Sequence, residues 1–203
     1  MHQAGRHIYK LEIFAALNRD LARSLRWWFF WVCLLASGPG LAGALSLQSI
    51  GLRANLSNAT TLGDPQPEDF EEYDLAINAR LPWQRDYDSG WCLGSRLMSS
   101  AGLLRGGGDS ALVLSLVPAL TFGTSDERFL LDAGAGLAYL SRSRFGSQDF
   151  GGPFQFALTV GIAVPIYKQL GIGYRFLHYS DAGMNGSNTV GADNHMLEVY
   201  YRF

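Results

Sequence analysis

The sequence predicts an all-β protein, an eight-stranded antiparallel transmembrane β-barrel of the outer-membrane type. From residue 45 onward, large apolar residues alternate with small or polar ones, which is the period of a β-strand. No apolar stretch in this part approaches the roughly 20 residues that a helix needs to span a bilayer. Glycine, at 24 of 203 residues, and aromatic residues, at 13%, suit a closed sheet with tight turns.

Residues 1–44 have the pattern of a secretory signal peptide. Basic residues dominate the first 26 positions, the apolar run WWFFWVCLLA follows, and LAGA at 41–44 ends in the small residues that a signal peptidase prefers. A single transmembrane anchor is the alternative, but the run is shorter than the roughly 20 residues of a spanning helix. We therefore expect cleavage near Ala44, which leaves residues 45–203 as the barrel domain.

The composition that remains after cleavage excludes several classes of partner. Residues 1–44 contain five of the 16 Lys and Arg and two of the 18 Asp and Glu, so 11 basic and 16 acidic residues remain, a net charge of −5. No basic patch is left that could hold nucleic acid. Cys33 leaves with the signal, Cys92 has no partner for an internal disulfide, and no cluster of Cys and His forms a metal motif. We therefore expect no nucleic acid, no metal and no cofactor.

Eight alternating segments follow one another after residue 45. In the clearest, from Phe154 to Ile166, every second residue is large and apolar and the residues between are small or polar. Charged residues of the other segments also fall on the small-residue face. Lengths of about 9 to 14 residues match tilted strands that cross a hydrocarbon layer. The predicted strands are 48–56, 70–82, 90–104, 110–122, 128–141, 154–166, 169–180 and 194–203.

A soluble eight-stranded barrel of the lipocalin type is the alternative architecture. Such a barrel would place its large apolar side chains inside, whereas the small and charged residues of this chain suit a narrow interior. The chain ends in LEVYYRF, which alternates and finishes on the aromatic Phe203. This ending is similar to that of bacterial outer-membrane barrel proteins and favours the bacterial outer membrane as the location.

Topology follows from alternation if both ends of the barrel domain lie in the periplasm, as is usual in this class. The expected external loops are 57–69, 105–109, 142–153 and 181–193, and the expected internal turns are 83–89, 123–127 and 167–168. The seventh strand then runs outward, and His178 and Ser180 lie at its external end. Alternate residues share a face of a strand, so both continue the lipid-facing row of Ile172, Tyr174 and Phe176.

His178 and Ser180 are a candidate pair of base and nucleophile. A serine hydroxyl is a weak nucleophile unless a neighbouring base takes its proton, and an acid that fixes the tautomer of the base improves the arrangement. The eighth strand pairs with the seventh, which makes Asp193 the best placed acid. Glu198 shares the inward parity of Arg175, so we expect these two to pair in the lumen. The alternative for the candidate pair is a polar marker of the boundary between lipid tails and head groups.

The last third of the chain carries segments that resemble a known family. They are LLDAGAGLAYLS, GGPFQFALTVGIAV and GYRFLHYSDAG. The most specific part is Arg175-Phe-x-His-x-Ser-x-Ala-Gly183, followed by Gly191-Ala-Asp193. From Phe129 to its end the chain resembles the lipid A 3-O-deacylases, which are outer-membrane enzymes, and residues 45–125 agree with them mainly in barrel pattern.

The resemblance implies an esterase that removes the 3-O-linked acyl chain from lipid A of lipopolysaccharide without a metal. By position, Ser180 would be the nucleophile, His178 the general base and Asp193 the orienting acid. An outward-facing site would let lipid A of the outer leaflet approach laterally. The candidates for oxyanion stabilisation or substrate positioning are Asp181, Ala182 and Gly183, through their backbone amides.

Two positions depart from the family pattern. Asp181 stands where Asn is usual, and an ionised side chain cannot donate to an oxyanion. Asp193 stands where Glu is usual and is one methylene shorter. Both changes would weaken or alter the activity.

Two other functions stay open at the level of sequence. A non-catalytic small barrel for adhesion or envelope structure would act through its loops at 57–69 and 142–153. An acyltransferase barrel would move an acyl chain between lipids instead of releasing it. The sequence also leaves open a homodimer and the preferred acyl chains.

Overall fold

The computed structural model describes residues 45–63, 65–186 and 189–203, and the predicted signal peptide lies outside these residues. Eight long strands close into an antiparallel barrel in the order β1-β10-β9-β8-β5-β4-β3-β2, which confirms the predicted fold class. No helix within the described residues is long and apolar enough to cross a membrane. The barrel strands are β1 (Ser46–Ser57), β2 (Glu71–Asp86), β3 (Trp91–Gly106), β4 (Asp109–Thr124), β5 (Leu130–Leu140), β8 (Phe154–Tyr167), β9 (Leu170–Ser180) and β10 (Ala192–Arg202).

The two faces of the barrel wall have opposite polarity. Large apolar side chains project outward along the strands, as Leu52, Val160 and Ile172 do. The buried inward side contains small residues, charged residues such as Arg53 and Asp132, and some larger apolar residues such as Met196. This polarity is the reverse of the one expected for a soluble lipocalin-type barrel, and it fits a wall that faces lipid.

Buried ion pairs fill the middle of the lumen. Arg53 donates to both oxygens of Asp74 at 2.6 and 2.8 Å. Asp132 accepts from Arg96 at 2.5 Å and from Arg175 at 2.8 Å. Pairing of this kind compensates for the cost of removing charged groups from water.

The predicted lumenal contact between Arg175 and Glu198 is also present. Glu198 Oε2 lies 3.6 Å from Arg175 Nε, within ion-pair distance but beyond a hydrogen bond. The hydrogen bonds of Arg175 go to Asp132 and Thr159 instead. Glu198 is therefore a member of the lumenal charge network, as its parity predicted.

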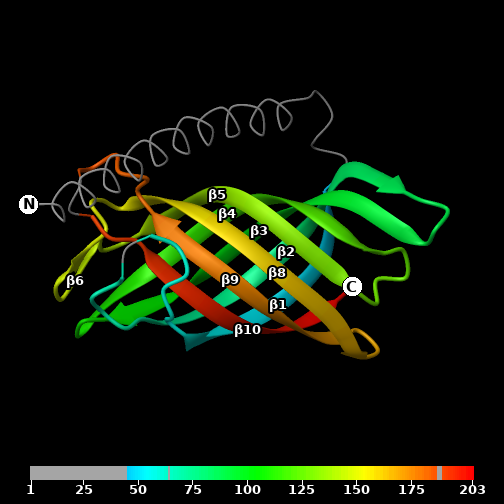
Figure 1. Cartoon of the computed structure of the whole chain (residues 1–203). Coiled ribbons are helices and arrows are strands. Elements are labelled where there is room, and N and C mark those ends of the chain that lie inside the picture. The colour runs from blue at the N-terminus through cyan, green and yellow to red at the C-terminus, as the bar shows by residue number, and fades with distance from the viewer. Residues whose placement is uncertain (1–44, 64, 187–188) are drawn as a thin grey trace, which may run out of the picture. The chain divides into compact units, whose positions relative to one another are not determined.

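The two ends of the barrel differ in their connections (Figure 1). The end here called the loop end carries the first loop (58–63 and 65–70), the hairpin loop (141–153) and the last loop (181–186 and 189–191). Among the described residues, the opposite end, here called the turn end, carries the C terminus and the short turns 87–90, 125–129 and 168–169. The turn expected at 83–89 is shorter than predicted, because a register shift between Arg80 and Gln84 lets β2 continue to pair with β3 as far as Asp86.

The hairpin loop contains two short strands that the alternation did not predict. They are β6 (Arg144–Phe145) and β7 (Gln148–Asp149). Phe145 and Phe150 pack edge-on against Phe70 of the first loop, with ring centroids 5.4 and 5.6 Å away. All three rings are buried, so this aromatic cluster ties two loops together at the loop end.

Candidate active site

The lipid-facing row of β9 has the composition that the sequence predicted. Ile172 and Tyr174 are exposed on the barrel wall, and Phe176 is half-buried. His178 continues the row but is only 8% exposed, and Ser180, at the end of the strand, is half-buried. The apolar wall therefore ends in two polar side chains, of which His178 is buried and Ser180 is half-buried.

Strand pairing brings Asp193 directly opposite His178. The two residues are register partners in the β9–β10 ladder, and β10 begins at Ala192, two residues earlier than predicted. The distance between His178 Nδ1 and Asp193 Oδ1 is 2.5 Å, and Asp193 is 1% exposed. Because an ionised carboxylate only accepts hydrogen bonds, Nδ1 carries the proton and Nε2 carries the free lone pair.

Ser180 and His178 border the same small space next to Gly191. A methyl group added to Gly191 would lie 3.1 Å from His178 Cε1 and 3.2 Å from Ser180 Cβ. In the described part of the chain, Ser180 makes no hydrogen bond to His178. Hydrogen bonds of catalytic groups are often long without substrate and tighten in the complex. A methyl group at this position would also clash with the carbonyl oxygen of Tyr179, so only glycine lets the last loop pack this closely against the end of β9.

Asp193 uses its second oxygen to bind the first loop. Oδ2 accepts the backbone N–H of Leu62 at 2.7 Å, and it also accepts the N–H of Thr61. Each oxygen of this carboxylate therefore has a separate task, since Oδ1 holds the imidazole and Oδ2 holds the loop.

Asp181 organises the last loop. Its carboxylate accepts the N–H of Gly183 at 2.8 Å, the N–H of Asn185 at 3.0 Å and the Thr189 hydroxyl at 3.0 Å. Ala182 adopts a left-handed conformation with φ of 53°, which costs free energy in a residue with a Cβ. The Gly183 amide is already engaged and would have to leave Asp181 to serve an oxyanion.

His195 lies on the same face of β10 as Asp193 and also contacts the first loop. Its Nδ1 lies 2.5 Å from the Tyr174 hydroxyl, and its Nε2 lies 2.9 Å from the carbonyl oxygen of Ala59. Because a carbonyl only accepts, Nε2 carries the proton and Nδ1 accepts from Tyr174. His195 therefore holds the loop and, within the described residues, makes no hydrogen bond to Ser180.

The hairpin loop connects the other two loops. The buried side chain of Gln148 donates to the carbonyl oxygen of Gly191 at 2.8 Å and accepts from the N–H of Glu68 at 3.4 Å. The Glu68 carboxylate in turn accepts the hydroxyl and the N–H of Ser147 at 2.6 and 2.8 Å. These bonds lower the pKa of Glu68 because they favour its charged form.

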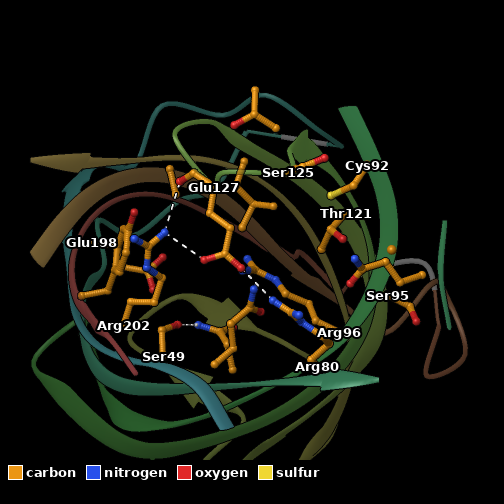
Figure 2. A pocket seen from close by; sticks show the side chains of 18 residues that line it. Ser49, Arg80, Cys92, Ser95, Arg96, Thr121, Ser125, Glu127, Glu198 and Arg202 are labelled. Carbon is orange, nitrogen blue, oxygen red and sulfur yellow. Dashed lines mark hydrogen bonds and ion pairs between the residues drawn. The ribbon is translucent and has the colours of Figure 1, made fainter. Parts of the chain in front are cut away.

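A cavity lies in the lumen near the turn end. Its volume is about 100 Å³, and Arg80, Arg96, Glu127 and Arg202 are among its lining residues. Figure 2 shows Glu127 between Arg80 and Arg202, whose guanidinium groups donate to it at 2.7 and 2.8 Å. None of the sequence-predicted site residues lines this cavity. Within the described residues, no group of three His, Cys, Asp or Glu side chains could hold a metal ion.

Sequence reasoning missed the loop residues that surround Asp193. Thr61 and Leu62 act through their backbone amides, which carry no signature in the side chains. Gln148 lies in a segment expected to be an irregular loop. Thr61 and Asp193 are 132 residues apart in the sequence, and no periodic pattern connects them.

Together these features define a small bacterial outer-membrane barrel that carries a serine, a histidine and a carboxylate on its lipid-facing wall. The chain belongs to the lipid A 3-O-deacylase (PagL) family, whose model matches residues 71–202. The matched segment includes Ser180, His178 and Asp193, and it begins after the first loop. Membership in this family and the barrel fold establish the bacterial outer membrane as its location.

Two curated relatives and one solved structure are similar to the chain. A lipid A deacylase PagL of Bordetella bronchiseptica is 33% identical over 89 residues, which are 44% of this chain and 49% of that protein. A lipid A deacylase PagL of Pseudomonas aeruginosa is 30% identical over 125 residues, 54% of this chain and 69% of that protein. The match therefore spans about half the length of the first relative. The crystal structure of the outer membrane enzyme PagL has a TM-score of 0.63 at 18% identity and covers 76% of this chain and 99% of that chain, which supports the fold.

Proposed function

We propose that the chain is a serine esterase that removes the 3-O-linked acyl chain from lipid A of lipopolysaccharide. The observation that carries this proposal is the hydrogen bond between His178 and Asp193, with Ser180 two residues further on the same face. The names of the two relatives point to the same substrate. Neither step of the proposed reaction uses a metal or a cofactor.

In the first step, Ser180 Oγ attacks the carbonyl carbon of the ester while His178 Nε2 takes the hydroxyl proton. Asp193 keeps the proton of Nδ1 in place and stabilises the imidazolium that forms. The tetrahedral intermediate collapses, the bond between the carbonyl carbon and the 3-oxygen breaks, and that oxygen receives the proton from His178. The acyl chain is then an ester of Ser180.

In the second step, water releases the acyl chain. His178 Nε2 takes a proton from water, the hydroxide attacks the acyl-enzyme, and the proton returns to Ser180 as the fatty acid leaves. The backbone amides of Asp181 and Ala182 are the proposed oxyanion donors. The amide of Gly183 would join them only if it released the Asp181 carboxylate.

The position of the site suits a substrate that stays in the membrane. His178 and Ser180 end an exposed apolar row, so a lipid could reach them from the side without leaving the bilayer. The proposal includes an orientation in which the loop end faces the cell exterior, where the outer leaflet holds lipid A. It also includes cleavage of residues 1–44 on export.

Mass spectrometry of lipid A tests the proposal. Cells that express the wild type should lose one 3-hydroxyacyl chain from lipid A, and cells that express Ser180→Ala should not. The folded state of both proteins is checked by the shift in gel mobility that heating causes in β-barrels.

Three other outcomes would contradict the proposal or part of it. A lipid A that gains an acyl chain would indicate the acyltransferase. An unchanged lipid A, with the wild-type barrel folded in the outer membrane, would contradict the esterase and favour the adhesion or envelope barrel. Equal loss of the chain with Ser180→Ala would refute Ser180 as the nucleophile.

A further inference from the structure

The first loop reaches Asp193 at three points. Its Thr61 and Leu62 amides donate to Oδ2. The side chain of Gln66 accepts the backbone N–H of Asp193 at 2.9 Å. Both the carboxylate and the main chain of the acid are therefore held by one loop that is far away in sequence.

Gln66 also closes the loop on itself. Its Nε2 donates to the carbonyl oxygen of Asn58 at 3.0 Å. Asn55 Nδ2 donates to Asn58 Oδ1 at 2.5 Å and to the carbonyl oxygen of Phe70 at 2.8 Å. These bonds join the beginning and the end of the loop, so the segment that carries Thr61 and Leu62 is held at its base.

A third anchor holds the loop against the barrel wall. His195 Nε2 lies 3.2 Å from the Thr61 hydroxyl, in addition to its contact with the carbonyl oxygen of Ala59. Tyr174 fixes the other side of the imidazole. The amide pair of Thr61 and Leu62 is thus placed by contacts to β9 and β10, the two strands that carry the proposed catalytic residues.

A carboxylate with two functions needs such support. Asp193 is 1% exposed, and a buried carboxylate is stabilised in its charged form by N–H donors. Bonds to Oδ2 also fix the rotation of the carboxylate, which leaves Oδ1 directed at His178.

We propose that the first loop is the positioning element of the active site and that Gln66 and the amide of Leu62 are its key groups. This inference rests on the proposed function. In its described residues, the loop makes no hydrogen bond to Ser180 or His178. It acts through Asp193, and its loss should lower turnover while leaving substrate binding unchanged.

Two variants remove the two kinds of contact. Gln66→Met keeps the size of the side chain and loses both hydrogen bonds. Leu62→Pro removes the amide donor, and Leu62→Ala is its reference, because it also truncates this 44% exposed side chain but retains the N–H. Gln84→Met makes the same chemical change at the turn end and should leave activity unchanged.

The assay is release of 3-hydroxy fatty acid from lipopolysaccharide by the purified, refolded full chain. We expect kcat to fall about tenfold to a hundredfold for Gln66→Met, and similarly for Leu62→Pro relative to Leu62→Ala, with KM unchanged. A double variant with Asp193→Asn tests whether Gln66 acts through the acid. If Gln66 acts through the acid, Gln66→Met should have little further effect on kcat in that background.

The outcomes separate this inference from the proposed function. A folded wild type that releases no fatty acid overturns both. A wild type that is active, with Gln66→Met and Leu62→Pro as active as their controls, overturns only the positioning role. A full additional loss of kcat from Gln66→Met in the Asp193→Asn background would show that the loop acts by a route other than the acid.

Discussion

Two carboxylates at opposite ends of the barrel are held in similar ways by different partners. At the loop end, Asp193 accepts from the imidazole of His178 and from two backbone amides. At the turn end, Glu127 accepts from the guanidinium groups of Arg80 and Arg202. Glu127 projects from a turn into the lumen with a φ of 56°, and it links that turn to β2 and β10. Each carboxylate joins segments far apart in sequence.

The difference lies in what the partner can do with its proton. Arginine stays protonated throughout the accessible pH range, so the Glu127 contact is a fixed ion pair. A histidine can take up and release a proton near neutral pH. The backbone amides at Asp193 add no mobile proton and no positive side chain. Glu127 is therefore held by fixed positive charges, whereas Asp193 is held in part by His178, the imidazole that moves a proton in the proposed reaction.

The largest expected effect comes from replacing His178, the proposed general base. His178→Gln keeps an N–H that can donate to Asp193 but has no site that accepts a proton from Ser180. We expect deacylation to fall by about 10²- to 10⁴-fold, the range of a general base, with an unchanged urea midpoint of unfolding. An active His178→Gln protein would contradict the role of His178 and the contrast between the two ends.

The buried arginines of the lumen should give a large effect on stability. Asp132→Ala removes the partner of both Arg96 and Arg175, whose side chains are 5% and 2% exposed. We expect the free energy of unfolding to fall by about 3–5 kcal/mol, because two buried cations lose their carboxylate. Urea titration of the refolded barrel measures this loss.

Asp132→Asn is the matched control for the lumen. It keeps an oxygen that can accept from Arg175 and should therefore lose less stability than Asp132→Ala. Equal stability of Asp132→Ala and the wild type would show that the lumenal charges are held mainly by their other neighbours, such as Glu198.

The smallest effect is expected at the turn end. Glu127→Gln removes the charge that Arg80 and Arg202 share, but these side chains are 43% and 28% exposed and remain solvated. We expect a loss of about 1 kcal/mol or less in the free energy of unfolding and unchanged deacylation. A strong loss of activity in Glu127→Gln would contradict this expectation, since it would show that the turn end affects the site at the loop end.

The outward row of β9 was predictable from local rules. Parity alone placed His178 and Ser180 with Ile172, Tyr174 and Phe176, because side chains alternate along any strand. Antiparallel pairing of neighbouring strands then made Asp193 the nearest carboxylate. The structure places Asp193 directly opposite His178, and its hydrogen bond to that residue is present. The catalytic roles of these residues stay predictions.

The role of Asp181 shows where local reasoning stops. From the sequence, its backbone amide was a candidate donor to the oxyanion, and its carboxylate was expected to be unable to donate there. In the structure its carboxylate binds Gly183, Asn185 and Thr189 of the last loop. This interpretation needed the conformation of the loop, which has no repeating pattern.

The barrel, the number of its strands and the face on which each strand residue lies could be predicted from the sequence. They follow from a period of two and from the need to hydrogen-bond every backbone group in lipid. The groups that hold Asp193 and the arginines that hold Glu127 could be identified only in the folded barrel. Contacts such as Thr61 with Asp193 and Arg202 with Glu127 depend on closure of the barrel and on the course of non-repeating loops. Closure brings distant segments together, and no short-range pattern records which of their atoms will meet.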